Sequence, residues 1–169
     1  MAEKILVAFS TKAGSTREIA EAIASRLGEK GLEVELQPMK KVKDLSGFNA
    51  VVLGAPMYMF HLVGDAPKFL SRFKNVLAEK PAAFFSLGWI NDKEEDRKTI
   101  LGNFDAEMAK FPWFKPVSTV VFGGKFDPQK LVFPYNLLPA MKDTPPADLR
   151  DWKKIEAWAD EVAEKFKIL

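Results

Sequence analysis

The stretch from residue 9 to residue 18, FSTKAGSTRE, combines hydroxyl groups, a glycine and a lysine. Hydroxyls and free backbone N–H groups donate hydrogen bonds to anions, lysine adds positive charge, and glycine lets the backbone curve closely around a ligand. Neither G-x-x-x-x-G-K-[ST] nor G-x-G-x-x-G is present, which disfavours a nucleoside triphosphate or a dinucleotide pyrophosphate. The stretch therefore favours one phosphate monoester, held by Ser10, Thr11, Lys12, Ala13, Gly14, Ser15 and Thr16.

The spacing of Ser15 and Glu18 also fits the capping box S-x-x-E, in which the two side chains satisfy the first N–H groups of a helix. A capped helix with solvated hydroxyls and no ligand is therefore the alternative interpretation. The two interpretations agree that a helix begins here, directly after an apolar run at 5–9, ILVAF.

Apolar strands and amphipathic helices alternate along the whole chain. Apolar runs predict buried strands at 5–9, 50–55, 82–87 and 117–123, and the alternating run LEVEL predicts an edge or near-edge strand at 32–36. Apolar residues at helical spacing predict helices over 15–31, 67–77, 98–110 and 152–166. This alternation predicts an α/β fold with a parallel sheet and helices on both faces, in a single domain over residues 1–169.

Composition narrows the function classes. The 25 basic and 23 acidic residues give a net charge of +2, which does not suit a nucleic-acid-binding protein. The chain has no cysteine, so disulfides, thiolate chemistry and iron–sulfur clusters are excluded, and with His61 as the single histidine we expect no metal site. The N-terminal residues MAEKILVAFS resemble neither a signal peptide nor a membrane span, so we expect a cytoplasmic protein.

The sequence STKAGST after a buried first strand resembles the FMN-phosphate loop of the flavodoxin superfamily. That family places flavin-ring loops after its third and fourth strands, where this chain has GAPMYMFH at 54–61 and SLGWIND at 86–92. The resemblance implies a flavodoxin-like three-layer sandwich with a five-stranded sheet in the order 2-1-3-4-5 and non-covalent FMN. It adds as cofactor-binding residues Pro56, Met57, Tyr58, Met59, Phe60, Ser86, Leu87, Gly88, Trp89 and Gly124.

Within the superfamily, the chain is most similar to the flavodoxin-domain branch that includes the menaquinone-dependent protoporphyrinogen oxidases. The features that carry this similarity are FSTKAGSTREIA, the histidine that ends GAPMYMFH, and a long insertion after GGKF. The similarity implies an FMN-dependent oxidoreductase whose partner is a redox protein or a small apolar substrate such as a quinone or a porphyrinogen. A flavodoxin-type electron carrier is the first alternative, and a flavin-free binding module is the second.

Two departures from the electron carriers favour an enzyme. The loop Met57-Tyr58-Met59 lacks the glycine that in carriers helps to stabilise one-electron-reduced flavin. Carriers are also strongly acidic, which suits docking to basic partners, whereas this chain is nearly neutral.

Three aromatic or titratable residues of these loops have two interpretations each. Tyr58 and Trp89 follow buried strands, so they either flank a flat ring or pack as ordinary core aromatics. His61 is the side chain that ordinarily titrates near neutral pH, so it either exchanges a proton during catalysis or is structural.

The segment at about 124–148 is an irregular insertion that contains five of the eleven prolines, which argues against a long helix. Its apolar run LVFPYNLLPAM is flanked by Lys130 and Lys142. This pattern fits contact with an apolar substrate or peripheral contact with a membrane, and it equally fits a cover over the sheet edge.

Overall fold

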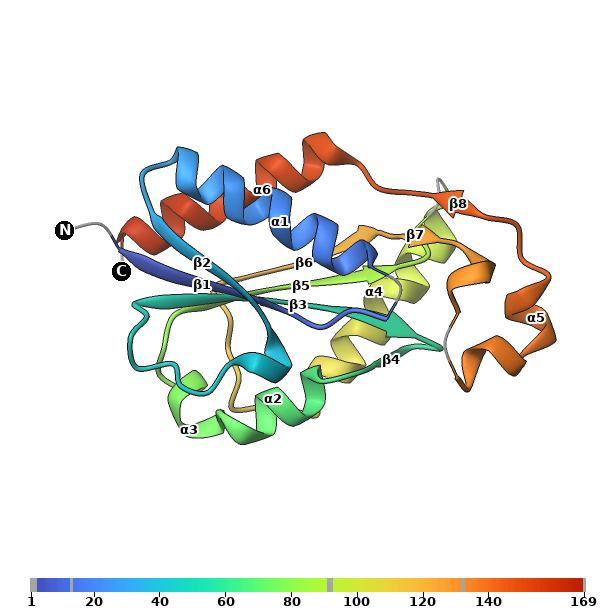
Figure 1. The fold of residues 1–169 in the computed structure, drawn as a ribbon, viewed down its shortest axis with the longest axis horizontal. Coiled ribbons are helices and arrows are strands. Elements are labelled where there is room, and N and C mark those ends of the chain that lie inside the picture. The colour runs from blue at the N-terminus through green and yellow to red at the C-terminus, as the bar shows by residue number, and fades with distance from the viewer. Residues whose placement is uncertain (1–2, 13, 91–92, 132, 169) are drawn as a thin grey trace.

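A parallel sheet forms the middle layer of the computed structural model, which describes residues 3–12, 14–90, 93–131 and 133–168 (Figure 1). The five parallel strands are β1 (Lys4–Phe9), β2 (Glu33–Pro38), β3 (Ala50–Tyr58), β5 (Ala82–Gly88) and β6 (Ser118–Gly123). Their order is β2-β1-β3-β5-β6, which confirms the predicted order 2-1-3-4-5 and the edge position of β2. A two-residue strand, β4 (His61–Leu62), pairs antiparallel with the end of β3 and was not predicted.

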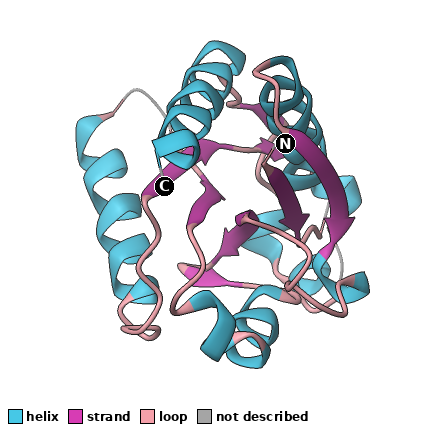
Figure 2. Ribbon diagram, turned by 90° about the vertical axis from the view of Figure 1, so that its left-hand side faces the viewer, coloured by secondary structure: helices cyan, strands magenta, loops and turns pink. Residues whose placement is uncertain are grey.

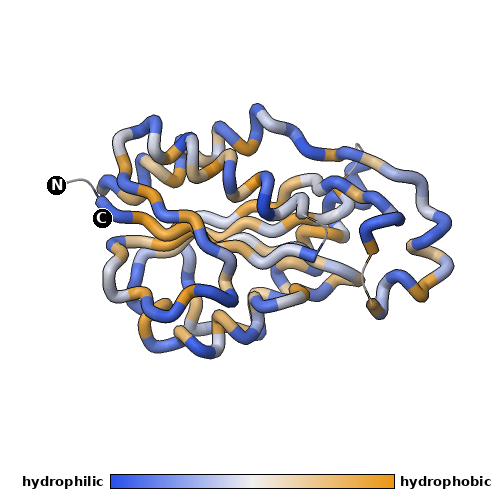
Figure 3. Tube along the Cα trace, viewed as in Figure 1, coloured by the Kyte–Doolittle hydropathy of each residue, from blue (hydrophilic) through white to orange (hydrophobic). Residues whose placement is uncertain are grey.

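Helices cover both faces of this sheet (Figures 1 and 2). One face carries α1 (Ser15–Glu29) and α6 (Trp152–Ile168), and the other carries α2 (Ala66–Arg72), α3 (Lys74–Leu77) and α4 (Glu94–Met108). Ile5 and Val7 pack into the core under α1 and α6, while Leu6 and Ala8 belong to the opposite core. Because alternate residues enter different cores, an inner strand such as β1 must be apolar on both faces, and Figure 3 shows much orange in this middle layer.

α1 and α6 end within two residues of their predicted ends, whereas the other two predicted helices differ more. The helix predicted at 67–77 is divided into α2 and α3 at Phe73, whose φ and ψ of −101° and 21° are not helical. The helix predicted at 98–110 begins earlier, at Glu94, where three acidic residues in the first turn complement the helix dipole. Neither change moves the carboxyl ends of the strands.

The insertion lies beyond the carboxyl ends of the strands, at the right of Figure 1. It contains a ribbon of β7 (Lys125–Phe126) and β8 (Ala147–Asp148), the short helix α5 (Pro139–Lys142) and two 3-10 turns, η2 (Pro128–Lys130) and η3 (Tyr135–Leu137). Within its described residues, 124–131 and 133–148, the α-helix is the four-residue α5, which agrees with the prediction that a long helix is absent there. Ligand crevices of such sheets open at this end.

Candidate functional site

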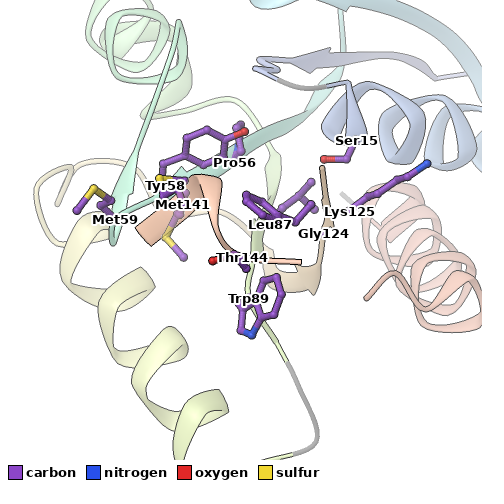
Figure 4. A pocket seen from close by; sticks show the side chains of 13 residues that line it. Ser15, Pro56, Tyr58, Met59, Leu87, Trp89, Gly124, Lys125, Met141 and Thr144 are labelled. Carbon is purple, nitrogen blue, oxygen red and sulfur yellow. The ribbon is translucent and has the colours of Figure 1, made fainter. Parts of the chain in front are cut away.

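The turn from β1 into α1 differs from the predicted capping box. Gly14, with a φ of 92°, is the N-cap of α1, and no side chain caps the helix there. The prediction was wrong because Ser15 is already the first helical residue, so its hydroxyl is not placed to cap. The Glu18 carboxylate instead pairs with the Arg150 guanidinium. The Ser15 hydroxyl is thereby left to line a pocket at the start of the helix (Figure 4).

Two hydroxyls shape this turn. The Thr11 hydroxyl accepts a hydrogen bond of 2.8 Å from the Gly14 N–H. The buried Ser10 hydroxyl accepts one of 3.1 Å from the Asp65 N–H, which ties the turn to the residue before α2. Lys12 is half-buried beside them, and Ala13 lies outside the described residues. Ser10 and Thr11 therefore hold the backbone in place for whatever binds at the helix end.

Thr16 is different, because its side chain is buried without a partner. The residue is 1% exposed, and its hydroxyl has no hydrogen-bond partner among the described residues. It lies in the first turn of α1, where geometry leaves N–H groups without acceptors and the helix dipole is positive. A methyl group added at Gly14 would meet no atom within 4 Å, so the approach to this end is open. The arrangement suits an anion.

Beside the helix end, a pocket of about 500 Å³ lies between the carboxyl ends of β3 and β5 and the insertion (Figure 4). Residues 56–58, predicted as a loop, are the last residues of β3. Nine residues that the sequence predicted as cofactor-binding line it together: Ser15, Pro56, Met57, Tyr58, Met59, Leu87, Gly88, Trp89 and Gly124. Its remaining lining residues come from the insertion and were not predicted as site residues: Lys125, Phe126, Met141 and Thr144.

Of the described residues predicted in the first turn, Ser15 alone lines this pocket, and three residues predicted after β3 and in β5 do not line it either. The Ser86 hydroxyl is fully buried and donates a hydrogen bond of 2.8 Å to the Ala55 carbonyl, so it joins β5 to β3. Phe60 is 57% exposed in the turn between β3 and β4. The His61 Nδ1 atom lies 2.7 Å from a carboxylate oxygen of Glu107 on α4, and His61 is not among the residues that line the pocket. The geometry thus gives His61 a structural partner.

The insertion supplies an aromatic neighbour for each of the two predicted ring-flanking residues. The ring centroids of Tyr58 and Tyr135 are 4.9 Å apart and those of Trp89 and Phe126 are 6.1 Å apart, both edge to face. Burial raises the pKa of the Tyr58 phenol, and Tyr135 raises it further, so this phenol stays protonated at neutral pH. The pocket consequently has aromatic walls on both the sheet side and the insertion side.

Charge at the pocket is confined to one residue. Among the described residues that line it, Lys125 is the one Lys, Arg, His, Asp or Glu, and Figure 4 shows it on the same side as Ser15. Within the described part of the chain, no group of three or more His, Cys, Asp or Glu side chains could hold a metal ion. No helix among those residues is long and apolar enough to cross a membrane.

A model of the flavodoxin domain matches residues 6–135. The chain belongs to the flavodoxin domain family. It is 27% identical over 123 residues to the protoporphyrinogen IX dehydrogenase [quinone] of Escherichia coli strain K12, covering 72% of this chain and 68% of that protein. It is 32% identical over 118 residues to the coenzyme F420H(2) oxidase of Methanothermobacter marburgensis, covering 63% of this chain and 29% of the oxidase.

A likeness to solved structures agrees with this family. Oxidised Flavodoxin 2 from Bacillus cereus superposes with a TM-score of 0.62 at 22% identity, over 96% of this chain and 99% of the flavodoxin. The comparison confirms the flavodoxin-like fold.

Proposed function

We propose that this flavodoxin-domain protein binds FMN non-covalently and acts as an FMN-dependent oxidoreductase. The observation that carries the proposal is the buried, unpartnered hydroxyl of Thr16 at the start of α1, beside a pocket with aromatic walls. A buried hydroxyl without a partner costs free energy, and an anionic oxygen at this helix end would remove that cost. The pocket volume of about 500 Å³ lies within the range of small-molecule sites.

The residues divide the binding between two ends of the cofactor. In this proposal Ser15, Thr16 and the first N–H groups of α1 bind the phosphate, while Ser10 and Thr11 hold the turn. Tyr58 and Trp89 bind the flavin ring through their flat faces. Bound FMN would supply hydride or electron transfer. The role of the chain is to orient the ring and to exclude water from it.

Two observations favour an enzyme over an electron carrier. The insertion adds Phe126, Met141 and Thr144 to the pocket lining, and its Tyr135 packs against Tyr58. This apolar cover suits a small substrate more than a docking protein. The net charge of +2 provides no strongly acidic surface for a basic redox partner.

We propose a quinone or a porphyrinogen as the substrate class. The similarity to the protoporphyrinogen IX dehydrogenase supports this class. Apolar side chains around the pocket support it as well, because Met59, Phe133 and Leu137 are 61%, 74% and 62% exposed. Peripheral contact with a membrane through 124–148 is part of the same proposal, since an apolar quinone resides in the membrane. Catalysis by His61 is not part of it, because that side chain points to Glu107.

The electron carrier remains the second candidate, favoured by the similarity of the fold to flavodoxins. One anaerobic reductive titration followed by absorbance separates the candidates. We expect a yellow protein that is reduced in one two-electron stage and is reoxidised by an added quinone. Reduction in two resolved one-electron stages, without reoxidation by the quinone, would favour the carrier. Failure to bind FMN would leave the flavin-free binding module.

A further inference from the structure

Arg150 joins three parts of the molecule outside the pocket. It lies two residues after the end of β8, and its side chain is only 8% exposed. Its Nε and Nη2 atoms donate hydrogen bonds of 2.9 and 2.8 Å to the two carboxylate oxygens of Asp148. Its Nη1 atom donates to Glu18 in the first turn of α1, and its guanidinium lies 4.8 Å from the Trp152 ring centroid. This buried cation therefore links the insertion, α1 and α6.

The backbone beside Arg150 is fixed against the pocket wall. The Leu149 N–H donates a hydrogen bond of 2.9 Å to the Gly124 carbonyl, and Gly124 lines the pocket. A Cβ atom on Gly123 would lie 2.2 Å from the Leu149 carbonyl oxygen, so glycine is required for this approach. The Leu149 backbone next to Arg150 is therefore bound to the pocket wall at Gly124, and the Arg150 side chain is bound to Glu18 on α1.

Charges around Arg150 are balanced at the end of α1 that faces the proposed phosphate site. Glu18 and Asp148 contribute two carboxylates, and Arg150 together with Lys125, which is opposite Asp148 in the β7–β8 pairing, contributes two cations. The hydrogen bonds from Arg150 hold the pKa of Asp148 below its usual range, so this carboxylate is charged at neutral pH. Without the guanidinium, the negative charge of Glu18 would be unopposed one helical turn from the N–H groups of Ser15 and Thr16.

We propose that Arg150 is a positioning residue that sets the affinity of the α1 N-terminus for phosphate by neutralising Glu18 and holding β8 against that helix. This inference rests on the proposed function, because it concerns the same end of α1. A residue that only stabilised the fold would affect every ligand of the pocket alike. Charge balance at the helix end affects only ligands that carry the phosphate.

The test compares FMN with riboflavin, which lacks the phosphate, in R150Q, E18Q and the double variant. We expect R150Q to weaken FMN about tenfold, as is typical of coupling between two sites, and to change riboflavin affinity less than about twofold. Adding E18Q to R150Q should restore most of the FMN affinity. The control K153Q removes an exposed positive charge nearby and should leave both affinities within about twofold.

Equal weakening of FMN and riboflavin, or no rescue by E18Q, would overturn the inference in favour of a structural role. If R150Q does not fold, E18Q alone still tests the inference. It removes the negative charge that the Arg150 guanidinium neutralises, so FMN should bind more tightly. Unchanged or weaker FMN binding by E18Q would contradict the inference. Inorganic phosphate is the third probe, followed through the backbone amide signals of Ser15 and Thr16. If the wild-type protein binds phosphate but not FMN, the proposed function is wrong but the inference about Arg150 can still be tested, through the phosphate affinities of the same variants. If the wild-type protein binds neither phosphate nor FMN, both proposals are refuted.

Discussion

Replacing Thr16 with valine should change apo stability and FMN affinity in opposite directions. Valine keeps the branched shape but removes the hydroxyl, which is buried and without a partner among the described residues. An unsatisfied buried polar group costs about 1–3 kcal/mol, so T16V should raise the free energy of unfolding of the apo protein by about 1 kcal/mol. In a domain of this size that is a rise of roughly 2–4 °C in Tm.

The same substitution should weaken FMN. A hydrogen bond to a charged group contributes about 1.5–3 kcal/mol, which corresponds to a roughly 10- to 100-fold higher Kd. Thermal unfolding of the apo protein and quenching of flavin fluorescence measure the two effects separately. Thr99 provides a control, because its exposed hydroxyl donates to the Glu95 carbonyl and T99V should not change FMN affinity.

Unchanged FMN affinity in T16V would refute the assignment of this hydroxyl to the phosphate. A lower Tm of the apo protein would show that the hydroxyl has a partner after all, and the reasoning from its burial would then fail.

Two further predictions concern the framework of the site. Burial alone would raise the pKa of Glu107, but hydrogen bonds from Lys110, His61 and the Leu62 N–H lower it below its ordinary value of 4.5. The ionised carboxylate therefore stabilises the fold above that pH, and this stabilisation is lost as the pH falls through the lower pKa of the folded protein. E107Q should lower the free energy of unfolding, measured with urea, by about 1–3 kcal/mol at pH 7 and by progressively less in more acidic buffers. A difference that does not change with pH would contradict this. G54A should lower Tm because its Cβ atom would lie 2.0 Å from the Phe85 ring, and F85L should restore part of the loss; an unchanged Tm in G54A would show that the ring moves freely.

Much of the fold could be predicted because its signals are local. The run at 5–9 is apolar throughout because alternate residues enter two different cores, and that requirement is visible in sequence. Loops at 56–60 and 86–90 were predicted for the ring from the family resemblance and because strand ends of a parallel sheet meet at one edge, and residues 56–59 and 87–89 do line the pocket.

The errors arose where long-range contacts decide. Ser15 and Glu18 have capping-box spacing, but Glu18 is bound by Arg150, 132 residues away in sequence.

The turn at Met59 and Phe60 has positive φ at both positions, although neither is the asparagine or glycine that usually marks such a hairpin. Lys125 and Phe126 come just after β6 and Gly124, so the GGKF segment was an available signal for both.

Met141 and Thr144 had no such signal. They reach the pocket only because the insertion packs over it through contacts such as that of Tyr135 with Tyr58.

The central claim is that the start of α1 binds the phosphate of FMN, and the relative affinity of the wild-type protein for FMN and riboflavin tests it most directly. Both ligands present the same ring to Tyr58 and Trp89, so any difference reports the phosphate alone. We expect one FMN to bind per chain, at least about tenfold more tightly than riboflavin, with a difference that shrinks as salt is added. Equal affinity for the two ligands, or binding of neither, would contradict the assignment.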